Sequence, residues 1–287
     1  MTFTVMRPYL LATGILLISS LGIGGNLLAA EEKTPAAKEA KSETVEFNEA
    51  EMLVFETNHM KTAKPGQTLA YNFERVSKLG DGFTDSVELL VNKGEGAGEK
   101  QVELQFFTGE RRRPYPSFGH VEANPLLTVF FNKDAWGLAR RIKAKGTANY
   151  LRNRIIDGFH DVKKIEEATC EVNGAKVPGK LIRFQPFASD KNAHHLVHYH
   201  AIEYRITLSP DVPGGVCSIQ SVIADQKDGV PDYYIARLKK QGMRDLASEA
   251  AKVNKSKGDG EPIIVETLSY VGVSDSSKAG LIKKEGE

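Results

Sequence analysis

Four of the seven histidines in the chain stand within seven residues, in the run HHLVHYH at 194–200. A strand over 196–208 would place His198 and His200 on one face, because side chains alternate along a strand. Their Cα atoms would lie about 6.6 Å apart, and two imidazoles at that spacing can reach one zinc or copper ion. The alternative is a polar strand end that binds no ion, since His195 falls on the opposite face. A specific site would need further ligands, for which the distant candidates are His59, His120 and His160.

A second group with recognisable chemistry is basic. Its members fall in two short runs, with Arg140 and Arg141 between them: Arg111, Arg112, Arg113, Arg152 and Arg154. Because the chain as a whole has a net charge of only +1, this local clustering predicts a surface for anionic lipid headgroups or phosphorylated glycans. The alternative is a solvated helix face.

Catalytic motifs are missing from the sequence. There is no Gly-x-Ser-x-Gly elbow and no His-Glu-x-x-His helix. The glycine-rich stretch 94–98 lies between two expected strands rather than before a helix, which indicates a hairpin tip and not a phosphate loop. The sequence therefore favours a protein that is not an enzyme, and apart from zinc or copper it predicts no cofactor.

The N-terminus has the pattern of an export signal. Arg7 precedes an apolar run at 9–23, and Ala29 and Ala30 precede two glutamates, which predicts a cleaved signal peptide over 1–30 and a periplasmic location. An uncleaved anchor is the alternative, because the run nearly reaches the about 20 residues of a membrane-spanning helix. No other segment predicts a span, and the balanced charge gives no reason to expect nucleic acid as a partner.

The chain has two cysteines, Cys170 and Cys217. In an exported protein a lone pair is typical of a disulfide, and both cysteines fall in strand-like segments. A free catalytic thiol is the alternative, but neither cysteine has a basic partner near it in sequence.

Composition divides the rest of the chain. Residues 31–45 contain only small and charged types and predict a disordered leader, and 274–287 predict a flexible tail. The segment 46–273 is expected to form a single β-rich domain with helical insertions near 124–160 and 232–252.

Alternating apolar residues predict the strands of that domain. Three early strands with short connections predict an antiparallel meander. Its expected inward positions are Leu69, Tyr71, Phe73, Val87, Leu89, Val102, Leu104 and Phe106. Later strands are expected over 163–172, 175–187, 196–208, 216–224 and 262–273, and Asn173-Gly174 is a strong hairpin turn.

Two helices interrupt this pattern. Asn124-Pro125 is a good helix start, and Thr147 can cap a second helix after Gly146. The sequence therefore predicts a mainly β fold with inserted helices (α+β), in which a curved antiparallel sheet is covered by two helices.

Three segments resemble a group of uncharacterised exported proteobacterial proteins: GERRRPYPSFGHVEANPLLTVFF at 109–131, YLRNRI at 150–155 and LSPDVPGG at 208–215. The resemblance implies export and supplies no catalytic residues. The arrangement of a β-meander, inserted helices and a late VPGG turn also resembles the periplasmic lipoprotein-carrier superfamily. That resemblance implies a half-barrel whose helices close an apolar cavity.

Three functions remain open. The first is a non-catalytic binding protein that carries a lipid or other apolar ligand in the half-barrel, with a cavity lined by Tyr71, Phe73, Leu89, Leu104, Phe106, Phe130, Phe131 and Trp136. The alternative for each of these residues is a purely structural role in the hydrophobic core. The second is a metal-binding protein that uses His198 and His200. The third is an envelope structural or assembly factor that acts through contacts with another envelope protein.

Overall fold

Nine antiparallel strands form one sheet, in the order β4-β3-β2-β1-β9-β8-β7-β6-β5. The structure is a computed structural model, and it describes residues 47–142, 147–188, 202–224 and 262–275, with isolated residues between 190 and 251. Residues Phe47–Glu287 form one compact unit, to which everything below refers.

The first half of the sheet is the predicted meander. Strands β1 (Gln67–Ser77), β2 (Phe83–Lys93) and β3 (Lys100–Phe106) pair in sequence, and the short β4 (Arg113–Pro114) adds to β3. Their inward positions are the alternating apolar residues, as the period of a strand requires.

The second half is also built of sequential neighbours. These strands are β5 (Ile165–Val172), β6 (Ala175–Phe184), β7 (Glu203–Leu208), β8 (Val216–Ala224) and β9 (Pro262–Asp275). Asn173 and Gly174 between β5 and β6 have φ of 51° and 80°, as a type I′ hairpin turn requires. Pairing of β1 with β9 joins the two halves.

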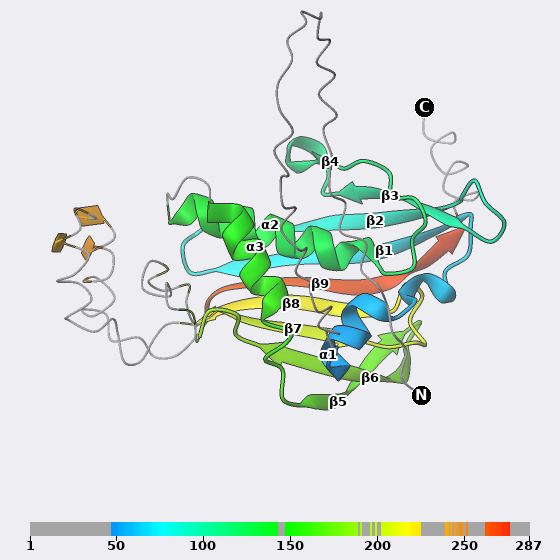
Figure 1. The fold of residues 1–287 in the computed structure, drawn as a ribbon. Helices are drawn as coiled ribbons and strands as arrows, with labels where there is room; N and C mark the ends of the chain where they lie inside the picture. The colour runs from blue at the N-terminus through cyan, green and yellow to red at the C-terminus, as the bar shows by residue number, and fades with distance from the viewer. Residues whose placement is uncertain are drawn as a thin grey trace, which may run out of the picture. The chain divides into compact units, whose positions relative to one another are not determined.

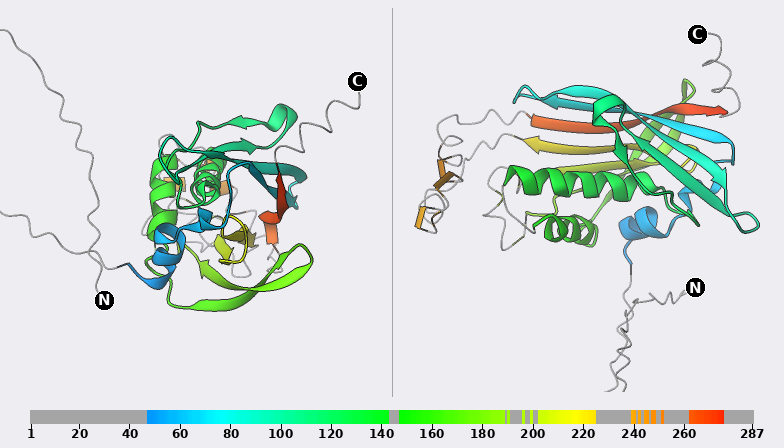
Figure 2. Two further views of the ribbon diagram at one scale, coloured as in Figure 1. Left: turned by 90° about the vertical axis from the view of Figure 1, so that its right-hand side faces the viewer. Right: turned by 90° about the horizontal axis from the view of Figure 1, so that it is seen from above.

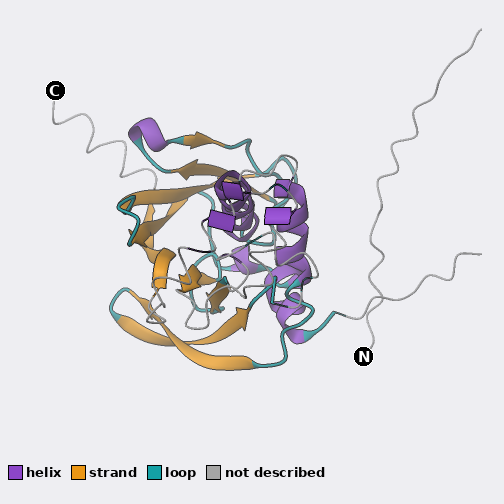
Figure 3. Ribbon diagram, turned by 90° about the vertical axis from the view of Figure 1, so that its left-hand side faces the viewer, coloured by secondary structure: helices purple, strands orange, loops and turns teal. Residues whose placement is uncertain are grey.

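The sheet curves around two helices (Figure 1). These are α2 (Pro125–Arg141) and α3 (Thr147–Asp157). A view along the strands shows the open curve of the sheet with the helices on its concave side (Figure 3). The half-barrel with a helical cover predicted from the sequence is therefore confirmed. Among the described residues, no helix combines the length and the apolar character needed to cross a bilayer.

Helix α2 starts where the sequence predicts. The Asn124 side chain accepts a hydrogen bond from the Leu126 N–H at 3.0 Å, and Pro125 occupies the first turn, where its missing N–H is not needed. The buried face of α2 includes Leu126, Phe130, Phe131, Ala135 and Leu138. The helix itself lies along the concave face of the sheet (Figure 2).

A segment before β1 closes one end of the half-barrel. The sequence patterns missed it: it comprises α1 (Glu49–Glu51), the π-helical turn η1 (Met52–Glu56) and the 3₁₀ turn η2 (His59–Lys61). The segment contributes Val54 and Met60 to the core.

The VPGG turn packs against this closed end. Asn124 Nδ2 donates to the Gly214 carbonyl oxygen at 2.8 Å. Gly214 and Gly215 have φ of 83° and 72°, and a Cβ at Gly215 would lie 2.9 Å from the His59 side chain. Both the backbone conformation and the close approach therefore require glycine here.

Aromatic rings fill the middle of the half-barrel. Phe131 of α2 packs edge-on against Tyr204 of β7 with ring centroids 5.7 Å apart. Tyr204 stacks on Phe184 at 5.3 Å, and Phe184 lies 4.3 Å from Phe159, which follows α3. Such contacts add to the stabilisation from burial alone, and they occupy the space between α2 and the β6–β7 part of the sheet.

A disulfide joins Cys170 of β5 to Cys217 of β8, with Cα atoms 5.9 Å apart. The sulfur of Cys170 lies against Gly179 of β6, where a Cβ would come within 2.8 Å. The bridge therefore fastens the β5–β6 hairpin to the rest of the sheet.

Two predicted elements differ from the structure or lie partly outside it. Strand β7 begins at Glu203, not at 196: Tyr199 N–H donates to the Leu196 carbonyl and Ile202 N–H to that of Tyr199, which is the pattern of turns. The segment predicted as a helix over 232–252 lies mostly outside the described residues.

Candidate functional site

A row of side chains, most of them polar, crosses the concave face of the sheet toward the end opposite the closed one. Strand pairing aligns Arg75 of β1 with Glu266 of β9, and Glu266 with Ser221 of β8. Ser221 in turn faces Tyr204 of β7, and Phe83 of β2 extends the row beyond Arg75. We call Arg75, Glu266, Ser221 and Tyr204 the polar row; all four are buried.

Strand alternation explains why charged groups point into the interior here. Arg75 has the same parity along β1 as Leu69, Tyr71 and Phe73, which are all fully buried. Glu266 has the same parity along β9 as Leu268. A buried charge is costly unless it is paired and hydrogen-bonded. Arg75 and Glu266 therefore need charged or hydrogen-bonding partners from the element that covers the concave face.

Helix α2 supplies those partners. The Lys133 ammonium forms an ion pair with Glu266 Oε2 and lies 4.0 Å from Asp134 Oδ1. It also sits 4.9 Å from the centre of the Phe73 ring, a cation–π distance. The Tyr204 hydroxyl donates to Asp134 Oδ2 at 2.6 Å. Helix and sheet are thus joined by a buried ionic cluster.

Arg75 extends this cluster toward the surface. One terminal nitrogen donates to Glu266 Oε1 at 2.5 Å, and the other donates to Asp81 Oδ2 at 2.7 Å. Its Nε is buried and has no hydrogen-bond partner within the part of the chain that the structure describes. The Nε–H of this guanidinium is therefore an unused donor.

Burial and neighbouring charges set the protonation of the cluster. Burial, together with the Glu266 carboxylate, raises the pKa of Asp134 to about 6, against the lowering influence of Lys133. Burial also acts to raise the pKa of Glu266, but Lys133 and Arg75 outweigh it and hold that pKa below its usual value. Burial, and then Asp134, raises the pKa of Tyr204. At neutral pH the cluster thus holds two carboxylates, one of them close to protonation.

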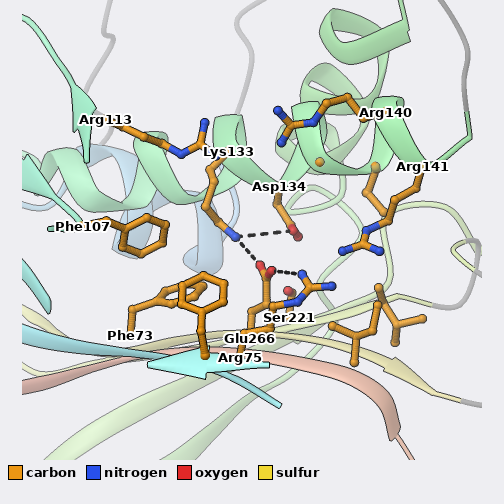
Figure 4. A pocket seen from close by; sticks show the side chains of 15 residues that line it. Phe73, Arg75, Phe107, Arg113, Lys133, Asp134, Arg140, Arg141, Ser221 and Glu266 are labelled. Atoms are coloured by element: carbon orange, nitrogen blue, oxygen red, sulfur yellow. Dashed lines mark hydrogen bonds and ion pairs between the residues drawn. The ribbon is translucent and has the colours of Figure 1, made fainter. Parts of the chain in front are cut away.

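A pocket of about 300 Å³ lies between the polar row and the C-terminal half of α2 (Figure 4). Its charged or hydroxyl-bearing lining residues are Arg75, Arg113, Lys133, Asp134, Arg140, Arg141, Ser221 and Glu266. Its remaining lining residues are Phe73, Phe83, Phe107, Gly137, Leu138, Ile223 and Ile264. The pocket thus combines an apolar wall with an excess of positive charge.

Phe107 reaches the pocket through an unusual backbone conformation. It follows the inward Phe106 in sequence, so strand alternation alone would turn its ring outward. Its φ of 68° places it in the left-handed region, which bulky residues seldom adopt. Asp85 holds the turn by accepting from the Thr108 N–H at 3.0 Å. The Phe107 ring consequently packs 4.8 Å from that of Phe73.

The eight residues predicted to line an apolar cavity do not all lie at the pocket. Of the eight, only Phe73 lines the pocket; buried and outside the pocket lining are Tyr71, Leu89, Leu104, Phe106, Phe130 and Phe131. Trp136 departs from the expected covering role, since it is 60% exposed. It lies off the buried face of α2, on the same side as the exposed Arg140 one turn later.

The predicted arginine set is divided between the segment 109–114 at the sheet edge and helix α3. Arg113 lines the pocket, Arg111 lies over the Phe83 ring at 4.8 Å, and Arg112 is exposed. On α3, Arg154 pairs with Asp190 at 2.8 Å, and Arg152 lies two residues before it. Within the described residues Arg113 has no acidic partner, whereas Arg154 is already neutralised.

The histidine pair stays a prediction, because His198 and His200 lie outside the described residues. The histidines suggested as further ligands have other contacts. His59 is buried: its Nε2 bonds the Leu53 carbonyl at 2.8 Å and its Nδ1 accepts from the Asn124 N–H at 3.2 Å. His120 lies 3.0 Å from Glu99, and His160 lies 3.6 Å from Glu51. No group of three metal-ligating side chains is found among the residues described.

Sequence reasoning missed Arg75, Lys133, Asp134 and Glu266 as site residues. A signal was present for two of them. Arg75 has the parity of Leu69, Tyr71 and Phe73 in its strand, and Glu266 lies between Ile264 and Leu268 at the same parity. For Lys133 and Asp134 the signal is weaker, since polar residues are common on the margin of an amphipathic helix.

Comparison with known proteins identifies no family. No protein-family model matches the chain, and no curated protein matches it significantly. Among solved structures, a LolA superfamily protein from Nitrosomonas europaea is 8% identical, and the match covers 78% of this chain and 92% of that chain with a TM-score of 0.18. A TM-score this low carries no argument about shared fold or function.

Proposed function

We propose that this protein is an exported, non-catalytic binding protein that holds a lipid or other apolar molecule between α2 and the concave face of its sheet. The observation that supports the proposal is the pocket of about 300 Å³ at the end of the half-barrel. Its volume is at the lower end of the roughly 300–1,000 Å³ of small-molecule sites, and its aromatic and aliphatic walls suit an apolar ligand.

The glycine at position 137 is consistent with a pocket that must stay free of side chains. It lines the pocket from within α2, and a Cβ at this position would meet nothing within 4 Å. A glycine inside a helix is about 1 kcal/mol less favourable than alanine. Position 137 of α2 therefore carries a residue that weakens the helix, at a point where any larger side chain would reduce the volume of the pocket.

Binding is favoured over catalysis by the chemistry of the pocket. Its described lining contains no histidine or cysteine, and the acidic groups are held by the ionic cluster. Asp134 accepts from the Tyr204 hydroxyl, and Glu266 is paired with Lys133 and Arg75. Groups fixed in this way position a helix over a sheet and leave the apolar wall for a ligand.

Export is supported by two independent features. The N-terminal segment has the pattern of a signal peptide, and the disulfide between Cys170 and Cys217 is of the kind that persists in oxidising compartments.

The decisive experiment fills the pocket. Gly137→Phe places a ring at the pocket wall, and we expect it to weaken binding of the neutral apolar fluorescent probe N-phenyl-1-naphthylamine at least about tenfold, as loss of most of the apolar contact requires. The matched control is Gly119→Phe: Gly119 also has no neighbour within 4 Å of an added Cβ, but it does not line the pocket. Equal probe binding by both variants and the original protein would refute the proposal.

Native mass spectrometry of protein purified from periplasm, without added metal, separates the other functions. We expect an organic adduct that solvent extraction removes. A stoichiometric metal ion that is lost in His198→Ala and His200→Ala would instead favour the metal-binding function. A spectrum of the bare chain, together with no uptake of the probe, would favour an envelope assembly factor.

A further inference from the structure

The pocket carries more positive charge than its own acidic groups balance. Five basic and two acidic side chains line it. The two inner cations, Arg75 and Lys133, are both paired with Glu266, and Lys133 also has Asp134 close by. The basic groups that remain are Arg113, Arg140 and Arg141.

These three arginines have little internal compensation. Arg141 lies 3.5 Å from Asp81 Oδ2, but that same oxygen already accepts from Arg75 at 2.7 Å. Arg113 and Arg140 are exposed and have no acidic partner in the portion of the chain that is described. Even when Asp81 is counted, the pocket retains a positive surplus at neutral pH.

The arginines come from opposite sides of the pocket. Arg113 belongs to β4 at the sheet edge, and Arg140 and Arg141 belong to the last turn of α2. Figure 4 shows Arg113 on one side of Lys133 and the α2 pair on the other. The C-terminal position on α2 is electrostatically favourable for cations, but it does not explain Arg113, which lies on another element.

The apolar wall lies beside this charge. Phe83 and Phe107 pack edge-on with ring centroids 5.5 Å apart, and the strand residues Ile223 and Ile264 complete the wall with Leu138 of α2. A site with unpaired cations and a hydrocarbon wall is complementary to a molecule with an anionic head and an apolar chain.

We propose that the pocket selects a single-chain anionic amphiphile. Arg113, Arg140 and Arg141 contact its carboxylate or phosphate head, and the Phe83–Phe107 side and Leu138 contact its chain. The inference rests on the proposed function and adds the ligand class to it. A volume of about 300 Å³ is small for two or three acyl chains, so a single chain is the occupant that fits the pocket.

The test compares ligands that share one chain length and differ in head charge. Displacement of N-phenyl-1-naphthylamine is measured with dodecanoate, dodecyl phosphate, neutral dodecanol and cationic dodecyltrimethylammonium, and inorganic phosphate alone is the chain-free arm. We expect both anionic amphiphiles to bind at least about tenfold more tightly than dodecanol, as contacts to charged groups typically give. We also expect the cation and inorganic phosphate to bind more weakly than dodecanol.

Variants assign the preference to the named arginines. Arg113→Gln and Arg140→Gln should each reduce the preference for dodecanoate over dodecanol about fivefold to tenfold and leave dodecanol binding unchanged. Arg112→Gln is the matched control, since Arg112 is exposed next to Arg113 and does not line the pocket; it should leave the preference unchanged.

The outcomes separate the two proposals. Failure of every amphiphile and of the probe to bind would overturn the proposed function itself. Equal binding of all four amphiphiles would leave the binding function standing and overturn the anionic selectivity. Binding of inorganic phosphate as tight as that of dodecyl phosphate would overturn the contribution of the chain.

Discussion

Asp134 is the group whose replacement tests the electrostatics of the site most directly. It lies between α2 and the sheet, where it faces Lys133, Glu266, Tyr204 and Ser221. Asparagine has nearly the same shape and can still accept the hydrogen bond from the Tyr204 hydroxyl. Asp134→Asn therefore removes a buried negative charge and leaves the packing in place.

The expected effect follows from the pKa. The pKa of Asp134 is about 6 in the folded protein and 3.8 in its ordinary state, a difference that corresponds to about 3 kcal/mol. Because the folded pKa is the higher one, the folded state binds the proton more tightly. Below about pH 4 the carboxyl is protonated in both states and imposes no penalty. As the pH rises from about 4 to about 6, the unfolded state loses the proton before the folded state does, so the free energy of unfolding falls by that amount and changes little at higher pH.

The assay is urea unfolding at a series of pH values from 4 to 8. The free energy of unfolding of Asp134→Asn, relative to the original protein, should increase by about 3 kcal/mol between pH 4 and pH 7. Most of the increase should fall between pH 4 and pH 6 and level off above that. Asp161→Asn is the control, since Asp161 is exposed and its replacement should give a flat difference.

Two results would refute this reasoning. A stability difference that does not change with pH would mean that Asp134 has no raised pKa in the folded state. A difference that decreases as the pH rises would mean that the carboxylate is net stabilising, with Lys133 outweighing the effect of burial.

Four further variants test the buried ion pair, the disulfide and the packing. Glu266→Gln leaves the buried ammonium and guanidinium without their shared carboxylate and should lower the free energy of unfolding by about 3–5 kcal/mol in urea titrations; a loss under about 1 kcal/mol would contradict the assignment of a buried ion pair. Cys170→Ser with Cys217→Ser should lower it by about 4 kcal/mol, given the separation of 47 residues, and added reductant should change the original protein but not the double variant. Phe131→Ala should cost about 3–5 kcal/mol, whereas Trp136→Ala, with 60% exposure, should change thermal stability by less than about 0.5 kcal/mol.

Local patterns were enough for much of the fold. Alternation along 69–73, 87–91 and 102–106 located three strands because each has one buried face. Asn173-Gly174 located a hairpin and Asn124-Pro125 a helix start, because positive φ and end capping each require particular residue types. The order of these elements predicted an antiparallel sheet with a helical cover, and the half-barrel was what the resemblance to the lipoprotein-carrier superfamily implied.

The sequence alone did not determine the limits of β7 or the segment before β1. The apolar run that begins at Leu196 continues into a true strand at Glu203, so its composition did not reveal where the pairing starts. The helical turns at 49–61 are short, and the apolar run at 52–55 shows neither the strand period nor the helix period, so their role in closing the half-barrel depends on long-range contacts. One such contact is the donation from Met60 N–H to the Glu122 carbonyl.

The sequence by itself determined most of the strand positions that face the interior, because the strand period is a local property of the chain. Only the tertiary structure decided which interior side chains contact one another. Arg75 and Glu266 lie 191 residues apart and become neighbours because β1 pairs with β9, which brings them beneath Lys133 of α2. The backbone at Phe107 turns a ring inward against the strand period. The pocket is a product of these non-local contacts. The sequence predicted a cluster of arginines, but only the tertiary structure showed that Arg113, Arg140 and Arg141 line one pocket.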